Sequence, residues 1–123
     1  MAKHNIIGQQ GEKKAQLFLV QHDYSILKNN WKWGKGEIDI IAKKDKKIIF
    51  VEVKTREYLR FGLPEENITQ KKINLMYELA TEYIHQIEHE GEIRFDVISI
   101  ILKPEIKINH IKDAFFPSWD ANT

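Results

Sequence analysis

The segment that decides the fold reads GEIDIIAKKDKKIIFVEVKTR and covers residues 36–56. It contains two runs rich in isoleucine and valine, separated by a lysine-rich stretch around Asp45-Lys46. β-Branched residues are enriched in strands, and a polar break between two apolar runs is typical of a turn. The segment therefore predicts two neighbouring antiparallel strands, near 37–43 and 47–55.

Charged side chains interrupt the apolar pattern of this hairpin. Because side chains alternate between the two faces of a strand, Glu52 and Lys54 share a face with Phe50. A tight turn centred on Asp45-Lys46 places Asp39 directly opposite Glu52. Opposed residues have Cβ atoms about 4.5–5.5 Å apart, and like charges at that distance destabilise a sheet. The two carboxyl groups therefore need a proton, a basic partner or a cation.

Two explanations of these charges remain open at this point. In the first, ion pairs between Glu37 and Lys54 and between Glu52 and Arg56 hold the strands, with Asp39 near solvent. In the second, a divalent cation lies between the carboxylates. The chain has no cysteine, and hard oxygen ligands favour Mg²⁺ or Mn²⁺ over zinc. Mg²⁺ usually takes only one or two protein carboxylates and keeps several waters, which suits this pair.

A third acidic residue comes from the N-terminal segment. The spacing of apolar residues predicts a helix over 5–22. Gly8, Glu12, Ala15 and Leu19 fall on one stripe of that helix, so Glu12 faces the same way as small and apolar side chains. Buried charges without partners are rare, and we expect Glu12 to join Asp39 and the other hairpin carboxylate.

The rest of the chain predicts one α/β domain over residues 1–123. A helix that begins after the N-cap Thr69 and closes at Gly91 lies between the third and fourth strands, which indicates a crossover and some parallel pairing. We therefore expect a mixed sheet covered on both faces. The other expected segments are a strand at 24–30, a loop at 31–36, a connecting segment at 56–68, strands at 93–102 and 106–111, and a frayed tail at 117–123.

The composition excludes several classes of protein. Hydrophobic residues make up 42% and charged residues 30% of the chain, an ordinary balance for a soluble globular domain. The N-terminus lacks the apolar run of a signal peptide and no stretch is long enough to span a bilayer, so we expect a cytoplasmic protein without a membrane partner. A net charge of +1 is too small for coating nucleic acid by bulk electrostatics, so any such contact needs a local patch.

Two features could form such a patch. Lys72 stands in the first turn of the predicted second helix, where a cation is unfavourable against the helix dipole, and with the helix N-terminus it can hold a phosphate. Trp31 and Trp33 flank Lys32 and are either loop anchors or surfaces for base stacking. His85 and His89 have a metal-capable spacing but lack the glutamate of an HExxH pattern, and a solvated helix face is the simpler interpretation.

The ordered set of motifs resembles a known superfamily. Asp39, then Glu52-x-Lys54 on the next strand, with Glu12 on the preceding helix, resembles the PD-(D/E)XK nucleases, especially the Holliday-junction-resolvase-like branch. More narrowly, the chain is similar to the YraN-like bacterial family. The proline of the superfamily's name is absent, with Glu37-Ile38-Asp39 in its place. The motifs that carry the likeness are Gly8-x-x-Gly11-Glu12-x-x-Ala15, Gly36–Ala42, Phe50–Arg56, Phe61-Gly62, Ile68-Thr69-x-x-Lys72, Arg94–Val97 and Ile111–Phe115.

This resemblance implies a restriction-endonuclease-like three-layer fold and a Mg²⁺- or Mn²⁺-dependent endonuclease that hydrolyses DNA phosphodiesters, with branched DNA as one candidate substrate. Asp39 and Glu52 would hold the metal with the Val53 carbonyl, and Glu12 would act through a metal-bound water. Lys54 would orient the attacking water or stabilise the charge that grows on the phosphate. The residues expected to contact nucleic acid are Lys72, Arg56, Lys32 and Trp31.

Other functions remain open from the sequence. The same fold could serve as a nucleic-acid-binding or adaptor module without efficient catalysis, and it would then bind DNA in a salt-dependent way. It could also be an interaction protein in which the charged cluster only sets strand register. Related resolvases act as two-fold dimers, so a homodimer is expected by analogy alone.

Overall fold

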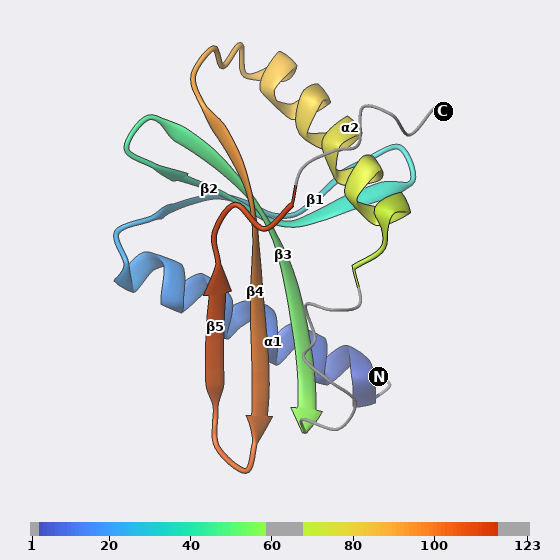
Figure 1. Ribbon diagram of the computed structural model, residues 1–123, viewed down its shortest axis with the longest axis vertical. Coiled ribbons are helices and arrows are strands. Elements are labelled where there is room, and N and C mark those ends of the chain that lie inside the picture. Colours follow the sequence, from blue (N-terminus) through green and yellow to red (C-terminus); the bar gives the residue numbers. More distant parts are fainter. Residues whose placement is uncertain (1–2, 59–67, 116–123) are drawn as a thin grey trace.

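The computed structural model describes residues 3–58 and 68–115, with side chains from residue 6 onward. Two helices and five strands make up this part of the chain (Figure 1). In chain order the elements are α1 (Lys3–Gln21), β1 (Ser25–Trp33), β2 (Gly36–Lys44), β3 (Lys47–Tyr58), α2 (Gln70–Gln86), β4 (Ile93–Lys103) and β5 (Lys107–Ile111). Within these ranges, neither helix is long and apolar enough to cross a membrane.

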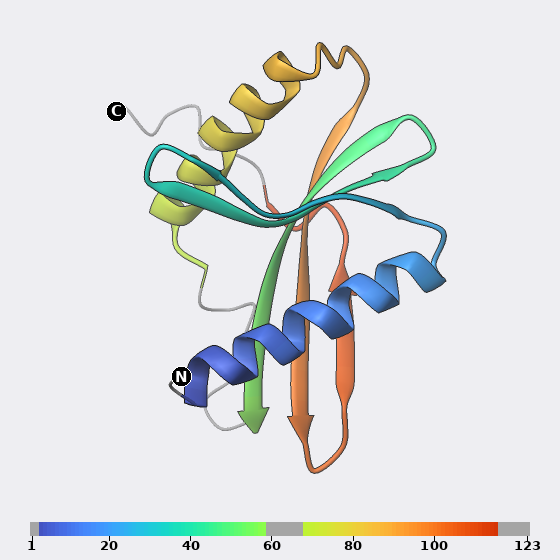
Figure 2. The ribbon, with the colours of Figure 1, turned by 180° about the vertical axis from the view of Figure 1, so that it is seen from behind.

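The five strands form one mixed sheet in the order β1-β2-β3-β4-β5. Neighbouring strands are antiparallel except for β3 and β4, which run parallel because α2 provides the crossover between them. The two helices lie on opposite faces of the sheet, α2 in front and α1 behind in Figure 1, and the reverse in Figure 2. The expected α/β class, mixed sheet and double cover are confirmed.

Each helix seals its own hydrophobic core. Ala15 and Leu19 of α1 pack on one face of the sheet, and Met76, Leu79 and Ala80 of α2 pack on the other. The buried sheet residues under α1 are Ile40, Ala42, Ile49, Val51, Ile98 and Ile100. Those under α2 are Ile38, Ile41, Ile48, Phe50 and Phe95. The strands between the helices are apolar on both faces, as expected for a sheet that is covered twice.

The central hairpin has the predicted register only along part of its length. The pairs run from Lys44↔Lys47 at the turn to Ile40↔Val51, with Asp45 in the left-handed region at φ 56°. Beyond Val51, β3 pairs only with β4, while the start of β2 pairs only with β1. The prediction that Asp39 and Glu52 oppose each other in the ladder is therefore wrong.

This separation of β2 from β3, called the fork below, coincides with a change in side-chain direction on β2. Ile40 lies in the core under α1, whereas Ile41 lies in the core under α2, as alternation requires. Ile38 should then face α1, but it also lies under α2. The strand thus turns near Asp39, and its first residues follow α2 instead of β3 (Figures 1 and 2). The expected pairing of Glu37 with Lys54 fails for the same reason.

Two element boundaries also differ from the prediction. The expected loop at 31–36 is strand as far as Trp33, since β1 stays paired to β2 until Trp33↔Gly36, and only Gly34-Lys35 form the turn. Helix α2 begins after the N-cap Thr69 as predicted but ends at Gln86, well before Gly91. The chain reverses after the end of α2 at Glu88, whose backbone lies in the left-handed region at φ 54°. The Phe61-Gly62 motif and the tail at 117–123 lie outside the described residues.

A buried ionic network joins β4 to β5. Asp96, fully buried, receives hydrogen bonds from Arg94 at 2.8 Å, from the Asp113 backbone N–H at 3.0 Å, and pairs with His110 at 2.7 Å. Burial alone would raise the pKa of Asp96, but these hydrogen bonds outweigh it and hold the pKa below its ordinary value. Arg94 also donates to the Tyr24 hydroxyl, so the network reaches the segment after α1. Arg94 and Asp96 thus form an ion pair within β4, with 2.8 Å between Nη2 and Oδ2.

Helix α1 lies against β3 at Gly11. A Cβ atom at Gly11 would overlap the Thr55 side chain and come within 2.7 Å of its Cβ, so only glycine permits this approach. Glu12 is the next residue of the helix, and its distance from β3 depends on this contact. At Gly8, by contrast, an added Cβ meets nothing within 4 Å.

The two glycines give a matched pair of substitutions. Gly11→Ala should destabilise the protein by about 1–3 kcal/mol, because the helix must move away from Thr55. Gly8→Ala should be neutral or stabilise it by up to about 1 kcal/mol, because alanine favours a helix and the site is open. Urea unfolding of both variants measures the difference, and equal effects would contradict the close contact of α1 with β3.

Candidate active site

The fork brings Asp39 and Glu52 together in a different way from a strand ladder. Where β2 leaves β3, the Asp39 carboxylate Oδ2 accepts a hydrogen bond from the Val53 backbone N–H at 2.8 Å. This bond replaces the main-chain partner that Val53 would otherwise find on β2. The carboxyl group of Glu52 interacts with that of Asp39 and contributes to a raised pKa of Asp39.

Glu52 is the most buried member of this group, with 4% of its surface exposed. Its Oε2 lies 3.3 Å from the Lys54 ammonium, and its Oε1 lies 3.8 Å from that of Lys72, which comes from α2. The second distance is too long for a hydrogen bond. Glu52 Oε1 is in fact buried without a hydrogen-bond partner among the described residues. A buried carboxylate oxygen in that state is costly unless something binds it.

Glu12 reaches the same cluster from the opposite face of the sheet. Burial is the largest effect on its carboxyl group and raises the pKa of Glu12; Glu37 and Glu52 raise it further, and a hydrogen bond with Asn30 opposes them. Asn30 has a left-handed backbone, φ 51°, within β1. Asparagine tolerates that conformation better than most residues. Three acidic side chains from α1, β2 and β3 therefore interact electrostatically at the fork.

Of the carboxyl groups in the cluster, that of Asp39 has the most strongly raised pKa. Burial raises the pKa of Asp39 to about 8, with further contributions from the charges of Glu52 and Glu12, and the Val53 hydrogen bond acts in the opposite direction. A carboxyl group in this state is neutral at physiological pH until a cation replaces the proton. The site is therefore a place where binding positive charge would relieve electrostatic strain.

The donor set fits a hard divalent cation only in part. Over residues 3–58 and 68–115, no three side chains of Asp, Glu, His or Cys type are grouped closely enough to hold an ion by themselves. Asp39 and Glu52, one with a raised pKa and one with an unpartnered oxygen, match the one or two carboxylates that Mg²⁺ normally takes. Waters and substrate oxygens would supply the other ligands.

The residues expected to contact nucleic acid are not all in one place. Lys72 lies at the cluster, and its backbone N–H donates to the N-cap Thr69 at 3.1 Å. Arg56 follows Lys54 on the same strand, and its Nε is buried with no hydrogen-bond partner in the described part of the chain. Lys32 is exposed on β1 and lies 3.9 Å from Glu37. Their contact with nucleic acid stays a prediction.

Trp31 occupies a different environment from the one that base stacking requires. Its ring packs against the core under α2 and meets Tyr83 edge-on, with 5.2 Å between ring centroids. Trp33, two residues later on the same strand, is 49% exposed. The sequence pattern did not single out Asn30 as a candidate for the site. The Asn29-Asn30 pair within an aromatic-rich stretch was the available signal, because asparagine is depleted in strands.

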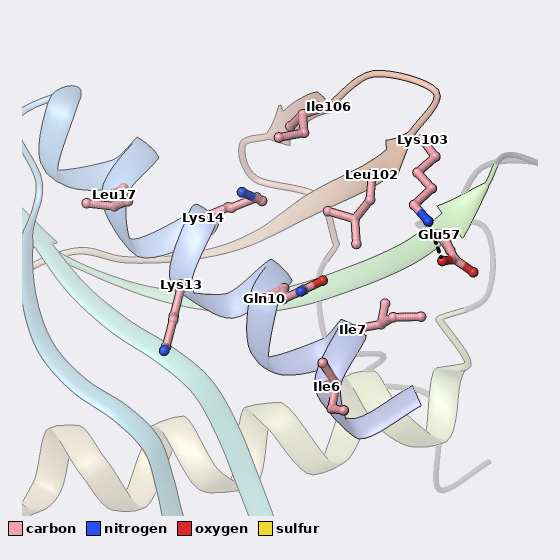
Figure 3. A pocket seen from close by; sticks show the side chains of 10 residues that line it. All are labelled: Ile6, Ile7, Gln10, Lys13, Lys14, Leu17, Glu57, Leu102, Lys103 and Ile106. Atoms are coloured by element: carbon pink, nitrogen blue, oxygen red, sulfur yellow. Dashed lines mark ion pairs between the residues drawn. The ribbon is translucent and has the colours of Figure 1, made fainter. Parts of the chain in front are cut away.

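A separate hollow lies away from this cluster. It has a volume of about 680 Å³ and is bordered by α1, the end of β3 and the hairpin of β4 and β5 (Figure 3). Ile7 and Leu102 form apolar parts of its lining, and an ion pair of 3.1 Å between Lys103 and Glu57 marks one edge. None of the three cluster carboxylates lines it.

The fold and the cluster define an α/β protein with a helix-covered mixed sheet and a buried carboxylate group at a strand fork. Residues 11–100 match the Uncharacterised protein family UPF0102, and the chain belongs to this family. It is 42% identical over 118 residues to a UPF0102 protein of Bacteroides fragilis, covering 95% of this chain and 98% of that protein. A UPF0102 protein of Caldicellulosiruptor bescii is 46% identical over 114 residues, covering 89% and 96%.

Among solved structures, Pyrococcus furiosus SfsA in complex with Ca²⁺ is similar at a TM-score of 0.37 and 18% identity. The match covers 89% of this chain and 63% of that one. A likeness at this level identifies no activity for the present protein.

The state of Asp39 predicts how stability depends on pH. Because its pKa is higher in the folded protein than in the unfolded chain, its contribution to stability is full below about pH 4 and is lost as the pH rises toward 8. Asp39→Asn keeps an acceptor for the Val53 N–H but cannot ionise. In a chelator, its melting temperature should exceed that of the wild type by about 5 °C or more at pH 8, with a smaller gap at pH 5.

Asp45→Asn is the matched control, since Asp45 is exposed at the hairpin turn and its backbone conformation also suits asparagine. Its melting temperature should follow the wild type at both pH values. If Asp39→Asn also followed the wild type, the Asp39 carboxyl group would be ionised in the folded protein throughout.

Proposed function

We propose that this protein is a divalent-metal-dependent endonuclease that hydrolyses phosphodiester bonds of DNA. The observation that carries the proposal is the pair of carboxyl groups at the fork, one with a raised pKa and the other with a buried oxygen that no described residue hydrogen-bonds. Mg²⁺ or Mn²⁺ would satisfy both groups at once, and the adjacent Lys54 and Lys72 supply positive charge for a phosphate.

The architecture supports this proposal. A mixed sheet with a parallel β3-β4 pair, covered by α1 and α2 on opposite faces, agrees with the restriction-endonuclease-like arrangement that the sequence resemblance implies. The order of the cluster residues along the chain, Glu12 on the first helix, then Asp39, then Glu52 and Lys54 on the next strand, follows the same pattern. We propose on this basis that the protein has the PD-(D/E)XK type of site.

Each residue of the cluster has a proposed role in hydrolysis. Asp39 and Glu52 would hold the metal ion, together with the Val53 carbonyl. When bound, such an ion polarises the phosphodiester and makes water more acidic. Lys54 stabilises the negative charge that grows on the phosphate as the water oxygen attacks phosphorus. Glu12, whose pKa is raised, accepts a proton from this water as its oxygen bonds to phosphorus. The P–O bond to the sugar breaks, and the leaving sugar oxygen takes a proton from solvent and becomes a hydroxyl group.

Lys72 and the start of α2 provide a second place for phosphate. The N-terminus of a helix carries a partial positive charge, and its first N–H groups attract anions. Lys72 is in that first turn and already lies 3.8 Å from Glu52. When a metal neutralises Glu52, the Lys72 ammonium becomes available for a phosphate next to the one that is cut. Branched DNA would place several phosphates near this position, and we propose it as the substrate class.

One observation favours a second function. Lys54 and Lys72 both approach Glu52 and neutralise it without any metal, as they would in a purely structural ion-pair network. The protein would then be a nucleic-acid-binding or adaptor module that keeps the fold but does not cut. The two proposals differ in how the protein responds to Mg²⁺ or Mn²⁺.

Cleavage assays test the first proposal directly. The wild type should cut at least one of duplex, single-stranded or four-way-junction DNA in Mg²⁺ or Mn²⁺, and should be inactive in a chelator. Asp39→Asn, Glu52→Gln and Lys54→Ala should each reduce the rate at least about 100-fold. Asp45→Asn and Glu57→Gln change the same residue types outside the cluster and should retain activity. A wild type that is inactive on all three substrates with both metals would refute the enzymatic role.

Thermal shift separates the two functions without a substrate. Mn²⁺ at about 100 times its dissociation constant should stabilise the wild type by about 2.7 kcal/mol, because it binds the folded state. Asp39→Asn should lose most of this stabilisation, whereas Asp45→Asn should keep it. An unchanged melting temperature of the wild type would favour the binding module, in which the cluster is already neutralised.

A further inference from the structure

We infer that the hollow between the β1–β2 hairpin and α2 binds one unpaired nucleobase of the DNA, which stacks on Trp33. The inference deepens the proposed function and depends on it for the nature of the ligand. It narrows the proposed branched DNA to DNA with an unpaired nucleotide next to the cleaved phosphate. Four features of the described residues carry it: an exposed aromatic ring, a rigid support, an adjoining hollow and proximity to the acidic cluster.

Trp33 presents an exposed aromatic surface on a supported hairpin. Its ring is 49% exposed and is parallel to that of Trp31 within 5°, with 6.5 Å between the centroids. Trp31 is fixed in turn by the edge of Tyr83 and by the core under α2. A ring held in this way loses little conformational entropy on binding a ligand, and base stacking on a tryptophan is worth about 1–3 kcal/mol.

The hollow next to Trp33 has a volume of about 380 Å³. The hairpin turn and one side of α2 enclose it, and Leu75 on α2 adds a second apolar surface that is 36% exposed. Glycine at position 36 allows the two walls to approach each other closely, because a Cβ atom there would come within 2.8 Å of the Leu79 side chain. The space between an aromatic ring and an apolar wall suits a flat ring better than a charged group.

The hollow lies next to the acidic cluster along both of its walls. Lys72 and Leu75 are three residues apart on α2 and therefore lie on the same side of the helix, one turn from each other. On the other wall, Trp33 pairs with Gly36, which is three strand residues, about 10 Å, from Asp39. A DNA strand with one phosphate at Lys54 and Lys72 thus passes its neighbouring nucleotide over the hollow.

The charges around the hollow predict which base it accepts. Residues 28–35 contain three lysines and no acidic residue, so the hairpin attracts the sugar-phosphate backbone. The wall of α2 carries Glu78 and Glu82, whose carboxylates accept hydrogen bonds from exocyclic amino groups. Cytosine presents such a group and thymine does not. The site should therefore prefer cytosine to thymine when both are unpaired.

An acidic peptide is a less suitable occupant. Its side chains would be repelled by Glu78 and Glu82 on the α2 wall, whereas a base offers amino groups to the same carboxylates. A double-stranded end is also less suitable, because its bases are stacked on each other and leave no free face for Trp33. The binding experiment described next distinguishes an acidic peptide and a double-stranded end from an unpaired base.

Fluorescence anisotropy in a chelator tests the inference without any cleavage. The probes are labelled single-stranded oligonucleotides of about 12 nucleotides, one of cytosine and one of thymine, and a blunt duplex of the same length. The wild type should bind the cytosine probe most tightly. Trp33→Ala should weaken that binding by roughly 5-fold to 150-fold, and Trp33→Phe should recover part of it. Glu78→Gln should reduce the preference for cytosine over thymine.

Leu17→Ala is the control, because Leu17 is an exposed apolar residue on α1, and it should bind as the wild type does. Equal binding by Trp33→Ala and the wild type, or no binding of any single strand by the wild type, would overturn the inference. Tighter binding of the duplex, or of an acidic peptide in competition, would overturn it too. If the wild type binds the cytosine probe through Trp33 but never cuts DNA, hydrolysis fails and the base site stands.

Discussion

The structure of the site depends on one constraint, the fork at which β2 leaves β3. Up to Ile40↔Val51 the two strands form an ordinary antiparallel ladder, and beyond it each strand follows a different neighbour. The backbone N–H of Val53 then needs a new acceptor, and the Asp39 carboxylate provides it at 2.8 Å. From the two helical layers, Lys72 of α2 lies 3.8 Å from the Glu52 carboxylate, and Glu12 of α1 interacts with Glu52 electrostatically.

Burying the carboxyl groups at the fork costs free energy, and the packing of the rest of the fold offsets this cost. Glu52 and Asp39 are carboxyl groups in a region from which water is largely excluded, and burial accounts for most of the raised pKa of Asp39. Two apolar cores, one under each helix, stabilise the sheet around them. The Asp96 network differs, although Asp96, on the adjacent strand β4, pairs with Val51, because Arg94, His110 and a backbone N–H all bind its carboxylate. Incomplete satisfaction at the fork distinguishes a site that can bind a cation from a structural ion pair.

Much of the fold followed from local patterns, and the errors occurred where tertiary contacts decide. The hairpin turn at Asp45, the N-cap at Thr69 and the parallel crossover were predicted, since each depends on a few neighbouring residues. The end of α2 was placed at Gly91 because glycine favours a left-handed backbone, yet Glu88 adopts that conformation in its place. Trp31 and Trp33 had the same two interpretations, because no local pattern tells which of two rings the neighbouring helix covers.

The sequence by itself determined that three acidic residues and a lysine belong to elements of one small α/β domain, since residue type, strand alternation and helical spacing are local properties. Only the tertiary structure decided how they meet. Strand pairing extrapolated from the turn placed Asp39 opposite Glu52. In the structure, packing of the early part of β2 against α2 separates the two strands. The Asp39 carboxylate then accepts the hydrogen bond from the Val53 N–H that a paired strand would otherwise accept. The direction of a strand beyond its paired region depends on which layer it packs against, and no local pattern contains that information.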